Sequence, residues 1–336
     1  MPPERALIDV LFVLSTRALL LDLAGPAEAF RLANQHLVDA GRAPRFRLRY
    51  AAPSAQVESS VGLVMAAIEP LPDALQAPTW LVLVGQPSAT LVKPDAATLA
   101  TAHWLNRRMR PLLHDDTAGH RLVTICSGTL LAARAGLLGS HRCTTHHELL
   151  DMLRGLAPEA QVVDNRVFVL DGALASSAGV TAGIDLSLHL IAQVGGDALS
   201  AAVARDMVVY LRRTPLDPEL SPMLAHRHHL HPAVHRVQDA ITERPTRDWD
   251  MASLSAVAHV TERHLSRLFG EHAGVSPLHY LEKIRLERAR QSLQHGASVT
   301  RAAEAAGFSS DLQLRRAWGR HWGGSPRDAA PRAGPS

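Results

Sequence analysis

Hydrophobic positions in the first two-thirds of the chain form short apolar runs separated by stretches with helical spacing. The apolar runs lie at residues 8–14, 46–50, 81–84, 122–125 and 167–170. The helical stretches lie between them, at residues 26–40, 95–109, 128–135 and 181–194. Such alternation predicts an α/β fold whose parallel sheet is covered by helices on both faces. Ligands bind such sheets beyond the carboxyl ends of the strands, so the residues that follow each run are the candidates for chemistry.

The C-terminal third shows only helical spacing and contains a helix-turn-helix pattern. Residues 254–258 predict one helix, and Thr261 is placed to cap the next. The apolar positions of that second helix face inward, which leaves Arg263, Ser266 and Arg267 on one outward face. A capped helix that presents such side chains fits the major groove of DNA.

The same pattern recurs at residues 299–318. Gly307 ends a helix, and Ser309 or Ser310 caps the following one. The outward positions of this second recognition helix are Gln313, Arg315 and Arg316. Arg side chains can read the O6 and N7 atoms of guanine, and Gln313 can pair with adenine. Some of these side chains are expected to hold phosphates instead, which positions the protein without specifying sequence.

A long helix is predicted between the two units. Pro277 occupies its first position, and it ends near Gly296. At 1.5 Å per residue this rod is about 25 Å long. When tilted, it suits two recognition helices that enter successive major-groove turns, which recur every ~34 Å.

The distribution of charge supports a DNA-facing C-terminal part. From His231 onward the chain has 15 Lys and Arg against 11 Asp and Glu, a balance of +4. The whole chain has 35 against 32, so the remainder has 20 against 21, or −1. A basic excess confined to one part is expected for a protein that faces phosphates. Because the excess is modest, it argues against a non-specific nucleic-acid-binding protein. A solvated, arginine-rich helical bundle is the structural alternative.

Specific motifs accompany the two units. They are Arg263-His264-Leu265-Ser266-Arg267-Leu268-Phe269, Gly274-Val275-Ser276-Pro277, Arg285-Leu286-Glu287-Arg288-Ala289-Arg290, Gly307-Phe308-Ser309-Ser310 and Gly324-Ser325-Pro326. In these motifs the chain resembles the AraC/XylS-type DNA-binding domain, over roughly residues 233 to 330. Trp318 and Trp322 stand where this family usually has Phe, a change of packing rather than of function. The predicted DNA-binding residues are Thr261, Arg263, Ser266, Arg267, Ser309, Ser310, Gln313, Arg315 and Arg316.

A cysteine follows the fourth apolar run, in the segment Thr124-Ile125-Cys126-Ser127-Gly128. A strand that turns sharply into a helix there holds the sulfur over the helix N-terminus. The helix dipole and free amides favour the thiolate, and a neighbouring amide can stabilise an oxyanion. Small residues at 176–184 also place helix amides at a strand end, which suits either a ligand carboxylate or close backbone packing.

Other motifs occur in order with this turn, namely residues 21–26, Thr144-Thr145-His146, Asp171-Gly172 and residues 176–185. Over roughly residues 6 to 205 they resemble the PfpI-like, class I glutamine amidotransferase-like fold, which includes isonitrile hydratases. The resemblance implies a flavodoxin-like sheet and an acid, Asp22, beside the elbow cysteine.

An enzyme of this kind would use Cys126 as nucleophile, with Asp22 and His146 as partners. Three features favour a sensor instead. Gly85-Gln86 stands where the fold usually has paired glycines, and His146-His147 where relatives usually have His-Trp. Fusion to a DNA-binding domain resembles the GlxA-type subgroup of AraC regulators, whose amidotransferase-like half senses a small molecule. No catalytic residue is therefore expected. Cys126 is interpreted as a pocket-lining or structural thiol, with catalysis or redox sensing as the alternative.

The predicted ligand-binding residues gather at the strand ends and are Asp22, Gly85, Gln86, Cys126, Ser127, His146, Ala178, Gly179 and Val180. Asp22 can bind a ligand amine or cap a helix. An aromatic content of 4% makes an aromatic cage for a quaternary ammonium ligand harder to build. The residues do not identify the effector, and no cofactor is expected.

Two cysteines, apart from any histidine cluster, fit neither a disulfide framework nor a zinc signature. The histidines at 226, 228, 229 and 231 are interpreted as part of a solvated linker rather than as a metal site. Asp9, Arg17 and Asp22 interrupt the apolar N-terminal stretch, so neither a membrane span nor a signal peptide is expected, and a cytoplasmic location is predicted.

These observations together predict a two-domain transcriptional regulator. Residues 1–205 form a PfpI-like sensor and dimerisation domain, 206–232 a linker, 233–330 the DNA-binding domain and 331–336 a disordered tail. The expected partners are promoter DNA, an unknown small-molecule effector and a second copy of the chain. The subgroup resemblance adds RNA polymerase. An isonitrile-hydratase-like or amidase-like hydrolase or lyase with an accessory DNA-binding domain is the alternative.

Overall fold

The computed structural model describes residues 7–75, 78–114, 119–209, 213–215, 226, 229, 231–294 and 296–329. The chain divides into two compact units, Met1–Glu219 and Leu220–Ser336. The division falls inside the predicted linker, residues 206–232, and the predicted tail at 331–336 lies outside the described residues.

The first unit is built on one main sheet. Its strands are β1 (Ile8–Val13), β2 (Phe46–Ala52), β5 (Glu69–Pro70), β6 (Thr79–Leu83), β7 (Arg121–Ile125), β10 (Phe168–Asp171) and β11 (Leu174–Ser177). Among the described residues they form seven strands in the order β10-β11-β7-β6-β1-β2-β5. All neighbours pair in parallel except β10 and β11, which are antiparallel.

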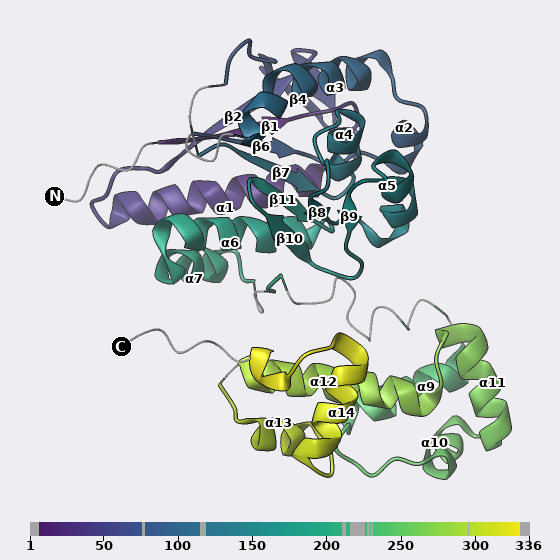
Figure 1. The fold of residues 1–336 in the computed structure, drawn as a ribbon. Helices are drawn as coiled ribbons and strands as arrows, with labels where there is room; N and C mark the ends of the chain where they lie inside the picture. The colour runs from purple at the N-terminus through teal and green to yellow at the C-terminus, as the bar shows by residue number, and fades with distance from the viewer. Residues whose placement is uncertain are drawn as a thin grey trace. The chain divides into compact units, whose positions relative to one another are not determined.

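Helices cover both faces of the sheet (Figure 1), because alternate strand residues point to opposite sides. Val10 and Phe12 of β1 join one core, and Leu11 and Val13 join the other. The first core is closed by α1 (Leu20–Asp39), α6 (Thr181–Gly195) and α7 (Asp197–Asp206). The second core is closed by α3 (Ala96–Arg108), α4 (Gly128–Arg134) and α5 (Leu150–Leu156).

Smaller elements complete this unit. They are β3 (Gln56–Glu58), β4 (Val64–Ala66), α2 (Ser88–Val92), β8 (Arg142–Cys143) and β9 (Gln161–Val162), with 3-10 turns at Arg110–His114 and His147–Leu149. The strands β3 and β4 pair as a short antiparallel hairpin outside the main sheet.

The α/β fold with helices on both faces is confirmed, and each of the five predicted apolar runs is a strand. Two details were wrong. The sheet is mixed rather than wholly parallel, because the edge strand β10 pairs with β11 in the antiparallel direction. The first helix begins at Leu20 rather than Pro26, so that Pro26 lies inside it.

The second unit is helical. Its helices are α9 (Pro232–Glu243), α10 (Met251–Ala258), α11 (Glu262–Ala273), α12 (Pro277–Gln294), α13 (Val299–Ala306) and α14 (Asp311–Trp322), followed by a 3-10 turn at Pro326–Ala329. The predicted long helix is α12, and it is shared by two small cores. Tyr280, Leu281 and Ile284 pack with α9, α10 and α11, whereas Leu286 and Leu293 pack with α13 and α14.

Histidines of the predicted linker pack against this unit, so the solvated interpretation was wrong for two of them. His226 approaches the carbonyl oxygen of Ala273 at 2.8 Å and Lys283 Nζ at 3.0 Å. His229 is buried, with 9% of its surface exposed, and its ring lies 4.6 Å from that of His235. His228 is outside the described residues. No described group of three or more His, Cys, Asp or Glu is arranged to hold a metal ion. Among the helices of the described residues, none is long and apolar enough to cross a membrane.

Candidate functional site

The turn after β7 adopts the sharp geometry of an elbow. Cys126 has a φ of 55°, a left-handed conformation that is costly for a residue with a side chain. Its amide donates to the carbonyl oxygen of Ser177 in β11 at 3.0 Å, and α4 begins two residues later at Gly128. A Cβ at Gly128 would collide with the carbonyl oxygen of Leu83, so glycine allows α4 to approach β6. The cysteine is 5% exposed and lies at the carboxyl edge of the sheet.

Asp22 lies beside this cysteine, as the family resemblance implies. It occupies the first turn of α1, is fully buried, and its Oδ1 accepts a hydrogen bond from the amide of Val180 at 2.8 Å. Burial raises the pKa of Asp22 to about 6, because desolvation of the carboxylate outweighs hydrogen bonds from Val180, the Cys126 side chain and Gly85. The carboxyl group therefore joins three elements: α1, the elbow and the turn into α6.

Two glycines close the space around Cys126. A Cβ at Gly179 would lie 2.6 Å from the cysteine sulfur, and one at Gly85 would lie 3.0 Å from the cysteine Cβ. Gly179 has a φ of 100°, which favours glycine for a second reason. Ala178 is buried beside it, whereas Val180 is 41% exposed. The predicted ligand residues from 178 to 180 are thus brought against the elbow, with little room left between them.

The segment after β6 is bonded directly to the elbow. The Ser127 hydroxyl donates to the carbonyl oxygen of Gln86 and accepts from its amide, both at 2.7 Å. The Gln86 side chain is 3% exposed, and neither its oxygen nor its nitrogen has a hydrogen-bond partner among the described residues. A buried amide without partners is costly, so this side chain is an available hydrogen-bonding group at the elbow.

His146 follows Thr145, a residue that contacts the elbow directly. The preceding Thr145 donates from its hydroxyl to the carbonyl oxygen of Cys126 at 2.8 Å. His146 itself accepts at Nδ1 from the amide of Glu148, and its ring lies 4.2 Å from that of His147. Thr145 was noted only as part of the Thr144-Thr145-His146 motif and not as a site residue, because nothing in the sequence indicates the contact that its hydroxyl makes.

The first recognition helix is α11, and it has the predicted orientation. Thr261 caps it by accepting from the amide of His264. Its apolar positions are buried, and Arg263, Ser266 and Arg267 are exposed. Arg267 forms an exposed ion pair with Glu271 at 2.8 Å, which a phosphate or a base edge can replace at small cost.

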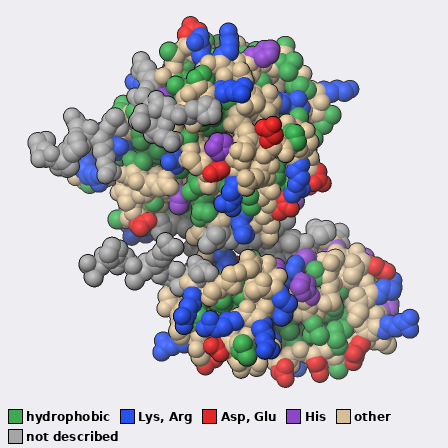
Figure 2. Space-filling model, viewed as in Figure 1, with side chains coloured by type: hydrophobic (Ala, Val, Ile, Leu, Met, Phe, Trp, Pro, Cys, Tyr) green, Lys and Arg blue, Asp and Glu red, His purple; other side chains and the backbone are tan. Residues whose placement is uncertain are grey.

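The second recognition helix is α14, and Ser310 is the residue that caps it. Gln313 and Arg316 are exposed, and Arg315 is half-exposed within 3.6 Å of Asp311. The Gln313 side-chain oxygen accepts from the amide of Ser309 at 2.8 Å and from its hydroxyl at 3.0 Å. Bidentate reading of adenine uses both the oxygen and the nitrogen of a glutamine, so Gln313 must release Ser309 to read adenine in that way. In Figure 2, Lys and Arg side chains gather on the surface of the second unit.

Comparisons with known proteins give the same division of the chain. Residues 9–193 match the DJ-1/PfpI family, and residues 254–331 match a helix-turn-helix domain. The HTH-type transcriptional regulator GlxA of Rhizobium meliloti is 30% identical over 326 residues, which cover 96% of this chain and 95% of that protein. The chain belongs to this family of AraC-type regulators with a DJ-1/PfpI domain.

Other members of the family match over shorter lengths. The HTH-type transcriptional regulator GbdR of Pseudomonas aeruginosa is 34% identical over 218 residues, which are 62% of this chain and 57% of that protein. The chain thus spans little more than half the length of that relative. A THiJ/PfpI family protein from Pseudomonas syringae superposes with a TM-score of 0.51 at 22% identity, covering 75% of this chain and 91% of that one. This structural likeness shows the fold alone.

Proposed function

We propose that this chain is a sequence-specific DNA-binding transcriptional regulator whose DJ-1/PfpI unit binds a small-molecule effector at the elbow. The supporting observation is the pair of capped recognition helices, α11 and α14, held at the two halves of one helix, α12. Each presents an exposed arginine that is available to contact DNA. These are Arg263 on α11 and Arg316 on α14. Helices of this kind read base edges in the major groove.

The elbow supports effector binding rather than turnover. Cys126, Asp22 and Gln86 place a thiol, a carboxyl group with a raised pKa and an unpartnered amide at one edge of the sheet. Perturbed and unsatisfied polar groups are typical of binding as well as catalytic sites. Relatives that match this chain over most of its length are regulators, which favours a sensor over a cysteine-dependent hydrolase or lyase.

In this proposal, residues 1–205 bind the effector and pair two copies of the chain, and residues 233–330 bind promoter DNA. Effector and DNA affinities are then coupled reciprocally, typically by ~1–3 kcal/mol. Contact with RNA polymerase and action in the cytoplasm, where promoters of bacterial relatives lie, belong to the same proposal.

The test is the DNA occupancy of the full-length protein across the genome of its host, followed by binding of purified protein to the recovered sites. Discrete sites with paired half-sites are expected. Arg263→Ala and Arg316→Ala should each weaken binding by ~1–3 kcal/mol if they read bases, and the loss should depend on the base pair contacted. Arg154→Ala, on α5 of the first unit, is the matched control.

A uniform loss across operator variants, with a salt slope reduced by about 1, would make either arginine a phosphate contact. Diffuse occupancy without a shared motif would reject the regulator. The variant Cys126→Ser distinguishes a structural thiol from a sensing one. If the response of DNA binding to the effector is unchanged, the thiol is structural. If the response is lost while the fold is intact, the thiol is part of the sensor.

A further inference from the structure

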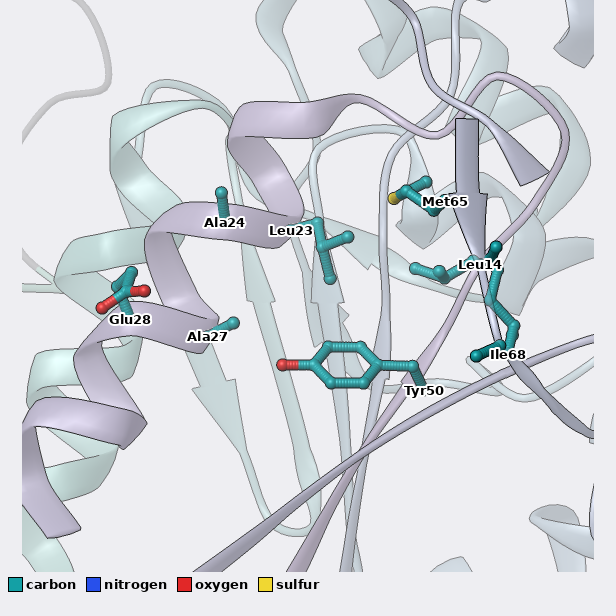
Figure 3. A pocket seen from close by; sticks show the side chains of 10 residues that line it. Leu14, Leu23, Ala24, Ala27, Glu28, Tyr50, Met65 and Ile68 are labelled. Carbon is teal, nitrogen blue, oxygen red and sulfur yellow. The ribbon is translucent and has the colours of Figure 1, made fainter. Parts of the chain in front are cut away.

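A pocket opens beside α1, lined by Leu23, Ala24, Ala27 and Glu28 of that helix (Figure 3). It has a volume of about 370 Å³ and lies where α1, the ends of β1 and β2 and the end of the β3–β4 hairpin meet. This volume falls within the usual range of small-molecule sites. Its principal lining residues are Leu14, Leu23, Glu28, Tyr50, Met65 and Ile68.

This pocket is separate from the elbow, although α1 contributes to both. Successive helix residues are turned by 100°, so Asp22 faces the elbow while Leu23 and Ala27 face the pocket. None of the residues predicted to bind ligand lines it. The elbow is tightly packed around Cys126, whereas the pocket beside α1 offers open volume.

The walls are apolar, with one polar corner. Tyr50 stacks on Phe12 at 5.5 Å, and Figure 3 shows its hydroxyl pointing toward α1 at Ala27. Burial, and the nearby Glu28 carboxylate, raise the pKa of Tyr50, so its phenol stays neutral and can donate or accept a hydrogen bond.

Glu28 is the charged residue among those that line the pocket, and its carboxylate is negative. It is paired with Arg31 at 2.6 Å, with about half of each side chain exposed. An exposed pair of this kind contributes little to stability, so a ligand cation can compete for the carboxylate. An anion would find no cationic side chain among the residues that line the pocket.

We propose that this pocket binds a small organic amine with an aliphatic or aromatic body. The apolar body lies against Leu14, Met65 and Ile68, and the ammonium group lies at the α1 side of the pocket, where the Tyr50 hydroxyl can accept a hydrogen bond from it and the Glu28 carboxylate attracts its charge. Binding would press on Leu23, the neighbour of Asp22, so that occupancy can reach the elbow through one turn of α1. The transmission from the pocket to the elbow rests on the proposed effector function. The binding of an amine in the pocket does not depend on it.

The test uses the full-length protein and three probes of matched size: phenethylamine, the neutral 2-phenylethanol and the anionic 3-phenylpropionate. Calorimetry should show saturable binding of phenethylamine that is at least tenfold tighter than that of the anion. Ala27→Trp, which fills the pocket, should weaken binding of both the amine and the alcohol at least tenfold. Glu28→Gln should weaken the amine about tenfold and leave the alcohol unchanged. Glu159→Gln, an exposed acid elsewhere in the unit, is the matched control.

Several results would overturn the proposal: no saturable binding of phenethylamine, equal binding of the anion, or an amine affinity that Glu28→Gln does not change. Val61 and Leu63 in the loop of the β3–β4 hairpin and Val64 at the start of β4 are exposed, so a second copy of the chain is the rival occupant. A change of oligomeric mass in Ala27→Trp without an effect of the amine would establish that rival. Operator binding is measured in the same variants. Lost amine binding with intact operator binding rejects the pocket alone, and absent operator binding in the unmodified protein rejects the regulator.

Discussion

The elbow at Cys126 and the turn of the second helix-turn-helix unit at Gly307 use the same backbone conformation in different ways. Both residues have a left-handed φ, 55° at Cys126 and 87° at Gly307. At Gly307 the turning residue itself has no side chain, since a Cβ there would lie 2.6 Å from the Cα of Thr246. At the elbow the turning residue keeps its side chain, and neighbouring glycines make the room. The comparison shows that the turn at Gly307 serves close packing of the backbone. The elbow at Cys126 instead holds a thiol in place, at the cost of backbone strain.

The largest expected effect is at Gly179. Gly179→Ala adds a Cβ against the cysteine and forces an alanine to a φ of 100°, so we expect the first unit to lose about 3–5 kcal/mol of stability. Hydrogen exchange with mass spectrometry, which reports each unit separately, measures the loss. The control is Gly172→Ala, whose φ is 59° but whose Cβ would meet nothing within 4 Å. Equal losses in both variants would show that backbone strain alone, and not the packing around Cys126, is responsible.

Gly307→Ala is the matching change in the second unit. The αL penalty and the collision with the backbone of Thr246 and Pro245 together predict a loss of about 2–4 kcal/mol. Gly296 has nearly the same φ, 86°, but a Cβ there would meet nothing within 4 Å, so Gly296→Ala should lose only about 1–2 kcal/mol. Urea unfolding of the two variants measures the difference. If they are equally stable, the close approach at Gly307 does not constrain the turn.

The third prediction concerns pH. Asp22 has a pKa near 6 in the folded chain against 3.8 in its ordinary state, so the folded protein binds a proton that the unfolded chain has already lost. Its contribution to stability is complete below pH 3.8 and is lost as pH rises to about 6, by ~1–3 kcal/mol in all. Asp22→Asn cannot titrate, so the difference in unfolding free energy between the two proteins should change across this interval. A constant difference from pH 4 to 7 would contradict the raised pKa.

The smallest effect is expected at the first helix-turn-helix turn, where His259 caps α10 with a φ of 56°. His259→Gly removes the left-handed strain of an exposed residue and should raise stability by about 0.5 kcal/mol. Glu304→Gly, at an exposed right-handed position of α13, should instead lower stability by about 1 kcal/mol. Thermal unfolding compares them. A stability gain at both positions would mean that the turn conformation is not the cause.

Most of the architecture was predictable because apolar runs and helix caps are local signals. β1, β2, β6 and β7 follow from their hydrophobic residues, and Thr261 and Gly307 mark the helix ends where the structure has them. β11 was missed because Ala175, Ser176 and Ser177 are small residues that are fully buried without being strongly hydrophobic. The start of α1 was missed because Pro26 was taken as its first residue, although the helix accommodates it in the second turn.

The site was predictable only where a motif marks it. Cys126 and its acid partner Asp22 were expected together because the resemblance to the PfpI-like fold implies it. The contacts of Thr145 and the attachment of Gln313 to Ser309 depend on distances that only folding sets. The pocket at Tyr50 and Met65 brings together residues from separate strands with ordinary core spacing, so no local pattern indicated it.

The length of the shared helix α12 fixes both the distance and the rotation between α11 and α14. Its 18 residues make a rod of about 27 Å, and the two cores meet along it between Ile284 and Leu286. One residue inserted there would rotate α14 about the rod by 100° relative to α11 and shift it by only ~1.5 Å. Seven inserted residues would bring the two helices back to within ~20° of their original phase. If α11 and α14 read two half-sites, as proposed above, the spacing of those half-sites is set by the length of α12 and can change only in steps of whole helical turns.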